Sequence, residues 1–259
     1  MISSELHKRI TDKIFRIQIF FKSFFPKKKF QKQYFIDDFI NKYKDKKRIV
    51  VFCSGPSANK AIAENMNLYI ATNDGYKFVV DNDLDFLFFL NDQYYINKNL
   101  IRGHKYLKND QLIVLFYTHT DLHKKAWFYL KNKMWMFGDK TFISFSDLMT
   151  GVPKTNYESL FAFYKDNGLP LKSQNSGMFI LLLGYYIAVK LDKPIDIYGL
   201  DLGLGGNLHY DKKGLVTKSI SRDRVKVNTK MYLDYMYNHH QDIKNYSNFY
   251  GNMTGFKEE

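Results

Sequence analysis

Short apolar runs alternate with helix-length segments along most of this chain, and this alternation limits the fold more than any other feature. From Arg48 onward, β-branched and apolar runs end in glycine, asparagine or aspartate. Parallel strands that are buried on both faces have this composition, and helices between them cover the sheet. The sequence therefore predicts an α/β fold with a mostly parallel sheet and helices on both faces. The predicted strands are 49–53, 68–72, 86–90, 112–116, 141–145, 195–199 and 243–249, and the predicted helices are 57–66, 156–166, 176–191 and 228–240.

Composition narrows the class of protein further. The chain has 259 residues, of which 45% are hydrophobic and 17% aromatic, so a disordered chain is excluded. The single cysteine, Cys53, excludes a disulfide scaffold and a cysteine zinc cluster and indicates a reducing compartment. We expect no secretory signal peptide. The longest apolar stretch, 178–189, is shorter than the about 20 residues of a transmembrane helix, so it predicts a buried helix.

Positive charge is concentrated at the N-terminus. Of the net charge of +13, residues 1–48 contribute most, with 14 lysines and arginines against 5 acidic residues. The nearly balanced remainder argues against a nucleic-acid-binding domain, which would spread basic residues over its folded surface. The sequence therefore divides into a basic segment, 1–47, and a folded domain, 48–259.

The basic segment predicts an amphipathic helix over 6–25. Ile10, Ile14, Ile17, Phe21 and Phe24 recur at helical spacing, and lysines and arginines fill most of the other face. Such a helix binds an anionic membrane surface, which would place the protein in the cytoplasm, peripheral on the inner face of the membrane. The alternative is that its apolar stripe packs on the folded domain or on a second subunit in a homo-oligomer.

Small and amide-bearing residues follow several predicted strands. Because ligands of open parallel sheets bind outside the carboxyl ends of the strands, these residues predict one polar rim that binds a ligand. Asparagine amides suit sugar hydroxyls and base edges, and the free N–H groups of a helix start suit a phosphate. The alternatives are a purely structural turn at Gly55-Pro56-Ser57 and a simple helix cap at Asn175-Ser176. The candidate ligand-binding residues are Ser54, Gly55, Pro56, Ser57, Asn73, Asn91, Asn175, Ser176, Gly177 and Asp201.

A glycine-rich loop after the strand at 195–199 carries the candidate catalytic residues. His209 titrates near neutrality and Tyr210 offers a phenol donor, although loop histidines are often only solvated. Asp81-Asn82-Asp83 looks like the metal site of transferases that use nucleoside diphosphate sugars, but it precedes a strand and so lies away from the rim. We interpret it as a solvated turn and expect no metal and no cofactor beyond the donor substrate. A donor with one phosphate, such as a cytidine monophosphate (CMP) sugar, fits this arrangement.

Together these residues resemble the bacterial sialyltransferases of glycosyltransferase family 42. The similarity spans roughly 48–250 and rests on RIVVFCSGPS at 48–57, Asn73, Asn91, SQNSG at 173–177 and PIDIYGLDL at 194–202. It implies one Rossmann-like domain, a variant of the GT-A fold, that transfers an acidic nine-carbon sugar from a CMP-sugar with inversion and without a metal. It also implies that the rim residues surround the nucleotide and the donor sugar, and that the acceptor is a glycan on a lipid or polysaccharide, as in lipooligosaccharide or capsule biosynthesis.

The chain departs from this family at Ser54, where the family typically has asparagine, and at two catalytic positions. Gly203 stands where the family has a tyrosine that assists the leaving phosphate, and Val225 lies nearest the place of the catalytic histidine. Either His209 is the base and Tyr210 the phosphate partner, or another residue is the base. The remaining alternatives are a transferase that uses CMP-Kdo or a nucleoside diphosphate sugar, and a non-catalytic protein that binds nucleotide or glycan.

Overall fold

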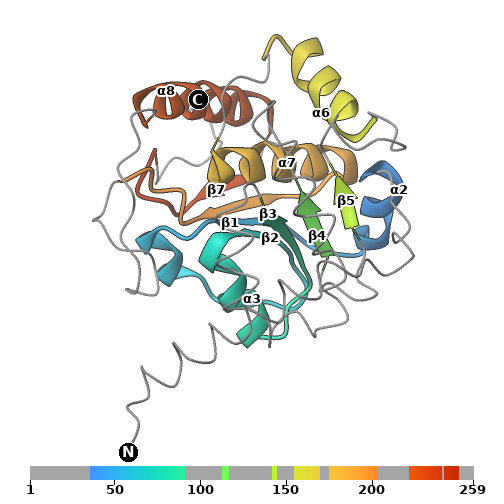
Figure 1. The fold of residues 1–259 in the computed structure, drawn as a ribbon, viewed down its shortest axis with the longest axis vertical. Coiled ribbons are helices and arrows are strands. Elements are labelled where there is room, and N and C mark those ends of the chain that lie inside the picture. Colours follow the sequence, from blue (N-terminus) through green and yellow to red (C-terminus); the bar gives the residue numbers. More distant parts are fainter. Residues whose placement is uncertain are drawn as a thin grey trace, which may run out of the picture.

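The computed structural model describes residues 36–90, 113–116, 142–144, 155–169, 175–203, 222–240 and 242–250 (Figure 1). The strands are β1 (Ile49–Phe52), β2 (Leu68–Thr72), β3 (Phe86–Leu90), β4 (Ile113–Phe116), β5 (Phe142–Ser144), β6 (Ile195–Tyr198) and β7 (Ile243–Asn245). The helices are α2 (Ile36–Ile40), α3 (Tyr76–Asp81), α6 (Thr155–Asp166), α7 (Ser176–Leu191) and α8 (Arg222–His239). Three short 3-10 helices are η1 (Asn41–Tyr43), η2 (Pro56–Lys60) and η3 (Asn73–Gly75). The N-terminal segment that predicts an amphipathic helix lies outside these residues.

The strands form one seven-stranded sheet in the order β5-β4-β3-β2-β1-β6-β7. Each neighbouring pair is parallel, with Val51 of β1 opposite Ile70 on one side and Ile197 on the other. The chain adds strands outward from β1 in one direction and then, from β6, in the other. This is the Rossmann-like arrangement, so the predicted α/β fold with a parallel sheet is confirmed.

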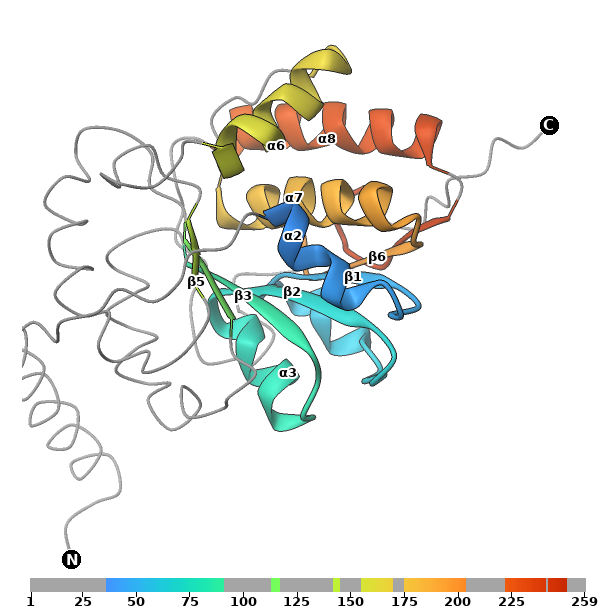
Figure 2. The same ribbon diagram turned by 90° about the vertical axis from the view of Figure 1, so that its right-hand side faces the viewer.

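Helices cover both faces of the sheet (Figure 2). α7 lies directly on one face, with α6 and α8 on its far side, while α3 lies on the opposite face (Figures 1 and 2). The core between α7 and the sheet includes Val51, Ile70 and Ile197, which alternate along their strands with residues of the other face.

α7 is buried between two layers, which explains its composition. Its residues from Met178 to Ala188 are all buried. A helix that packs on a sheet and on other helices at once has no solvated face and must be apolar all round. The predicted buried helix over 176–191 is confirmed with the same bounds.

The predicted elements differ from the structure in four places. The predicted helix over 57–66 is only the single turn η2, after which the chain is extended. Tertiary contacts override helix propensity there, because the hydroxyl of Tyr69 accepts a hydrogen bond from the N–H of Glu64 (3.1 Å) and holds this stretch beside β2. The last strand ends at Asn245 rather than at 249. In addition, α8 begins at Arg222 rather than at 228, and α3 was not predicted.

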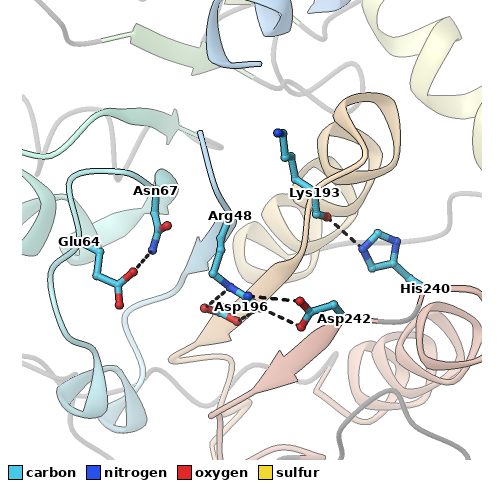
Figure 3. Close-up of polar contacts among 7 residues, drawn as sticks. All are labelled: Arg48, Glu64, Asn67, Lys193, Asp196, His240 and Asp242. Atoms are coloured by element: carbon cyan, nitrogen blue, oxygen red, sulfur yellow. Dashed lines mark hydrogen bonds and ion pairs between the residues drawn. The ribbon is translucent and has the colours of Figure 1, made fainter. Parts of the chain in front are cut away.

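An arginine joins three strands at their amino ends (Figure 3). Arg48, just before β1, donates two hydrogen bonds to Asp196 of β6 (both 2.9 Å) and two to Asp242 just before β7 (3.3 and 3.0 Å). Nearby, the His240 ring donates to the carbonyl of Lys193 (3.0 Å). Because this network lies at the amino ends of the strands, it stabilises the sheet at the edge away from the predicted ligand rim.

None of the helices described here is long and apolar enough to cross a membrane.

Candidate functional site

The direction of chain growth in the sheet reverses between β1 and β6, and the loops after these two strands therefore diverge. In open α/β sheets, ligands bind at the carboxyl ends of the strands beside such a reversal. Five residues from three loops and the first turn of α7 lie at this place, and we call them the switch-point cluster: Gly55, Ser57, Gly177, Asp201 and Asn248.

Asp201 is the centre of the switch-point cluster. Its carboxylate accepts hydrogen bonds from the N–H of Ser57 (2.8 Å), the hydroxyl of Ser57 (2.5 Å) and the N–H of Asn248 (2.7 Å). The Ser57 hydroxyl in turn accepts from the N–H of Gly199 (3.1 Å). Asp201 and Ser57 are each only 3% exposed. Because their polar groups bind one another inside the protein, these two residues hold the loops after β1, β6 and β7 together.

Gly55 allows the loop after β1 to lie directly against this carboxylate. Its N–H donates to the carbonyl of Gly199 (3.0 Å), and a Cβ at this position would come closer than 3 Å to both Asp201 and that carbonyl. Pro56 follows at the first position of η2, where a proline fits because that N–H has no helical partner. Ser54 is buried beside them. The turn is therefore a close-packed element, and only glycine fits at position 55.

The start of α7 lies next to the end of β1. The carboxamide of Asn175 accepts from the N–H of Met178 (2.8 Å), so Asn175 is a helix cap, the alternative to its prediction as a ligand-binding residue. The Cα of Gly177 faces Cys53 and Leu200, since a Cβ there would lie 3.4 Å from the Cys53 sulfur and 3.3 Å from Leu200 Cδ1. The first turn of a long buried helix is thus held at the switch point.

The first turn of α7 leaves hydrogen-bonding groups available. Ser176 is 7% exposed, and its hydroxyl has no hydrogen-bond partner among the residues described. Neither its N–H nor that of Gly177 has one within the same residues. A helix of this length carries a partial positive charge at its N-terminus. These groups together suit an anion such as a phosphate.

Cys53, the only cysteine of the chain, lies between β1 and α7. It is 4% exposed, and its thiol points toward the carbonyl of Gly177 (3.9 Å). Burial raises the pKa of this thiol, and the charge of Asp201 raises it further. The thiol is therefore protonated and unreactive while this part of the protein is closed.

Asn73 lies at the same edge of the sheet but outside the switch-point cluster. It begins η3 directly after β2 and has a left-handed backbone (φ 52°), which asparagine tolerates. The turn packs on the end of β1, because a Cβ on Gly75 would lie 3.0 Å from the carbonyl of Phe52. Asp74, next to Asn73, pairs with Lys77 (3.3 Å).

The other predicted site residues are placed as follows. Asn91, His209 and Tyr210 lie outside the described residues, so their roles stay predictions. Asp81 ends α3, and the exposed turn that follows it leads into the amino end of β3, on the edge opposite the switch-point cluster. Within the described ranges, no three His, Cys, Asp or Glu residues are grouped so that they could hold a metal ion.

Gly203 has a structural reason to be glycine. It ends the turn after Asp201 with φ at 89°, a conformation that side chains of L-residues rarely adopt. A tyrosine at this position would strain that turn. The departure from the family-42 pattern at 203 therefore agrees with the local backbone of this chain.

Sequence reasoning missed the contribution of segment 246–250. Residues 246–249 were assigned to the last strand, whereas the strand ends at Asn245 and the following residues turn toward Asp201. The hydroxyl of Ser247 accepts from the N–H of Leu200 (3.0 Å). The strand itself, Ile243–Asn245, holds a single apolar residue, so no apolar run marked its end and the strand-end rule gave no signal for this segment.

Comparisons of the chain with protein-family models, with curated proteins and with solved structures found no match.

Proposed function

We propose that this protein is a metal-independent, inverting glycosyltransferase that binds a CMP-sugar beside the switch-point cluster. The transferred sugar would be sialic acid or a related nonulosonic acid, and the acceptor a surface glycan. The observation that carries the proposal is the position of the α7 start at the end of β1, because the N–H groups and the Ser176 hydroxyl of this turn have no partner within the part of the chain that the structure describes. The resemblance of the sequence to the family-42 sialyltransferases supplies the identity of the donor.

The hydrogen-bonding groups in the first turn of α7 suit a donor that carries a single phosphate. The first turn of α7 offers two N–H groups and a hydroxyl that have no partner among the described residues. Backbone and hydroxyl donors bind a phosphate monoanion without a metal, and they stabilise the charge that develops when that phosphate leaves.

We assign different roles to the predicted residues according to their burial. Ser57 and Asp201 position the loops, since their polar groups are committed to each other. Asn73 and the backbone at Gly55 would contact the cytidine, and Asn91 would extend toward the sugar. His209 would accept the proton of the acceptor hydroxyl as that oxygen attacks the anomeric carbon from the face opposite the phosphate. The bond from this carbon to the phosphate oxygen then breaks and CMP leaves, with Tyr210 donating to its phosphate.

A donor-hydrolysis screen with the full chain tests this proposal. We expect slow release of CMP from CMP-N-acetylneuraminic acid, with the same rate in the presence of a chelator. His209→Ala should lower turnover by about 10²–10⁴-fold, the usual contribution of a general base, and leave CMP affinity unchanged. Release of nucleotide from a nucleoside diphosphate sugar that depends on manganese would contradict the proposal. CMP binding without any hydrolysis would indicate a binding protein instead.

We also propose that the protein works at the inner face of a membrane, where lipid-linked acceptors are built. The basic, apolar segment 6–25 would bind anionic lipid there. The full chain should float with vesicles that contain phosphatidylglycerol, and a chain without residues 1–30 should not, while it still transfers sugar to a soluble acceptor. Equal flotation of both chains would refute this location.

A further inference from the structure

We propose that the side chain of Asn248 binds a pair of sugar hydroxyls on the CMP-sugar, so that segment 246–250 is part of the ligand site. This inference rests on the proposed function. It starts from the observation that the loop after β7 is attached to the same carboxylate as the loop after β1.

The backbone of Asn248 is fixed at the switch point. Its N–H donates to the buried Asp201 carboxylate (2.7 Å), which also accepts two hydrogen bonds from Ser57. A buried carboxylate that accepts several hydrogen bonds is a rigid attachment point, because breaking one of them leaves a charge less well solvated. The Cα of Asn248 is therefore held beside the loop that carries Gly55.

The neighbours of Asn248 use their own polar groups to shape this segment. The carboxamide of Asn245 donates to the carbonyls of Phe249 (3.1 Å) and Tyr250 (3.0 Å) and accepts from the N–H of Ser247 (3.0 Å). Tyr250 donates its hydroxyl to Asp234 of α8. The ring of Tyr246 stacks on that of Tyr198, with 4.5 Å between centroids. The segment is thus tied to β6, α8 and its own backbone.

Asn248 differs from these neighbours. Its side chain is exposed, and its carboxamide makes no hydrogen bond within the part of the chain that the structure describes. The fixed backbone and uncommitted side chain leave this carboxamide available to a ligand at the switch point. A carboxamide offers a donor and an acceptor side by side, which matches two neighbouring hydroxyls of a sugar.

Both the ribose and the transferred sugar carry hydroxyls, and binding measurements with three ligands show which of the two sugars Asn248 contacts. Affinities of CMP, 2′-deoxy-CMP and CMP-N-acetylneuraminic acid are measured for the full native chain and for Asn248→Ala. Loss of neutral hydrogen bonds should weaken binding by about 3–10-fold. If the ribose is the ligand, CMP binds more weakly to the variant and the native preference for CMP over 2′-deoxy-CMP disappears. If the transferred sugar is the ligand, only CMP-N-acetylneuraminic acid binds more weakly.

Asn238→Ala is the matched control, because Asn238 is also exposed but lies in the last turn of α8, near the amino ends of the strands. It should bind all three ligands as the native chain does, and both variants should unfold at the native denaturant concentration. If Asn248→Ala binds all three ligands with native affinity, the inference is wrong and the proposed function stands. If the native chain binds none of them, both are wrong.

Discussion

Replacing Arg48 with methionine should lower the free energy of unfolding at pH 7 by about 3 kcal/mol, the low end of the cost of removing one partner from a buried ion pair. The guanidinium of Arg48 is the group that binds both Asp196 and Asp242. The Asp196 side chain is only 10% exposed, so without Arg48 its charge would lie in the sheet with poor solvation. Methionine keeps most of the apolar volume, which limits the effect to the lost charge.

The pH dependence of the unfolding free energy of the Arg48→Met variant shows whether the ionised Asp196 causes the loss of stability. Burial raises the pKa of Asp196 above its ordinary value even with Arg48 present, and the hydrogen bonds from Arg48 lower it only in part. Without Arg48 the folded-state pKa should rise further. A carboxyl with a raised folded-state pKa destabilises the fold when it is ionised, so the deficit of the variant should shrink as the pH falls below that pKa. Urea unfolding at pH 7 and at pH 5 measures this change.

Lys230→Met is the control for the Arg48→Met variant. Lys230 also pairs with an aspartate (2.8 Å to Asp234), but both side chains are well exposed, at 55% and 39%. Exposed pairs contribute little, so this variant should unfold close to the native denaturant concentration at both pH values. Equal, small effects of the two substitutions would show that the Arg48 network does not stabilise the sheet.

Gly55→Ala should abolish measurable CMP binding. A Cβ at this position would overlap the Asp201 carboxylate, which is held by hydrogen bonds from Ser57 and Asn248, and the carbonyl of Gly199. The loop after β1 would have to move away from β6, which separates the groups that we expect to bind the nucleotide. Overpacking of this kind also costs about 1–3 kcal/mol of stability, so unfolding is measured together with CMP affinity.

Gly168→Ala is the control for Gly55→Ala, because it should lower stability without affecting CMP binding. Gly168 has a left-handed backbone (φ 73°) just after α6, and a Cβ there would meet nothing within 4 Å. The substitution should cost about 1 kcal/mol through backbone strain alone. This control should bind CMP as the native chain does. If Gly55→Ala also keeps native CMP affinity, the nucleotide does not bind at the switch point.

Much of the fold could be predicted because one pattern, the alternation of apolar runs with helix-length segments, determines it. Strands β2 and β3 have the predicted bounds, and α7 was recognised since no polar residue interrupts 178–184. These segments are covered by other elements on two faces, and this burial requires apolar residues along their whole length. Periodicity predicts a segment less well when contacts with distant residues determine its conformation. The stretch after η2, which forms a hydrogen bond with Tyr69, was therefore taken for a helix.

The candidate site could be predicted only in part. The strand-end rule identified Gly55, Ser57 and Asp201, and the start of the apolar helix identified Gly177; the structure brings these residues together. It did not show that Asp201 and Ser57 bind each other, because neighbouring polar residues in a sequence do not reveal which of them are buried. Asn248 was missed because the end of the last strand was placed too late.

The most direct measurement of the central claim, that CMP binds at the switch point, uses the single cysteine. Cys53 is buried between β1 and the start of α7, so a thiol reagent reacts with it only when these elements open. CMP at ten times its dissociation constant, measured by calorimetry, should slow this reaction about tenfold, while AMP and UMP at the same concentration should slow it much less. An unchanged rate at saturating CMP, or no CMP binding at millimolar concentration, would contradict the account.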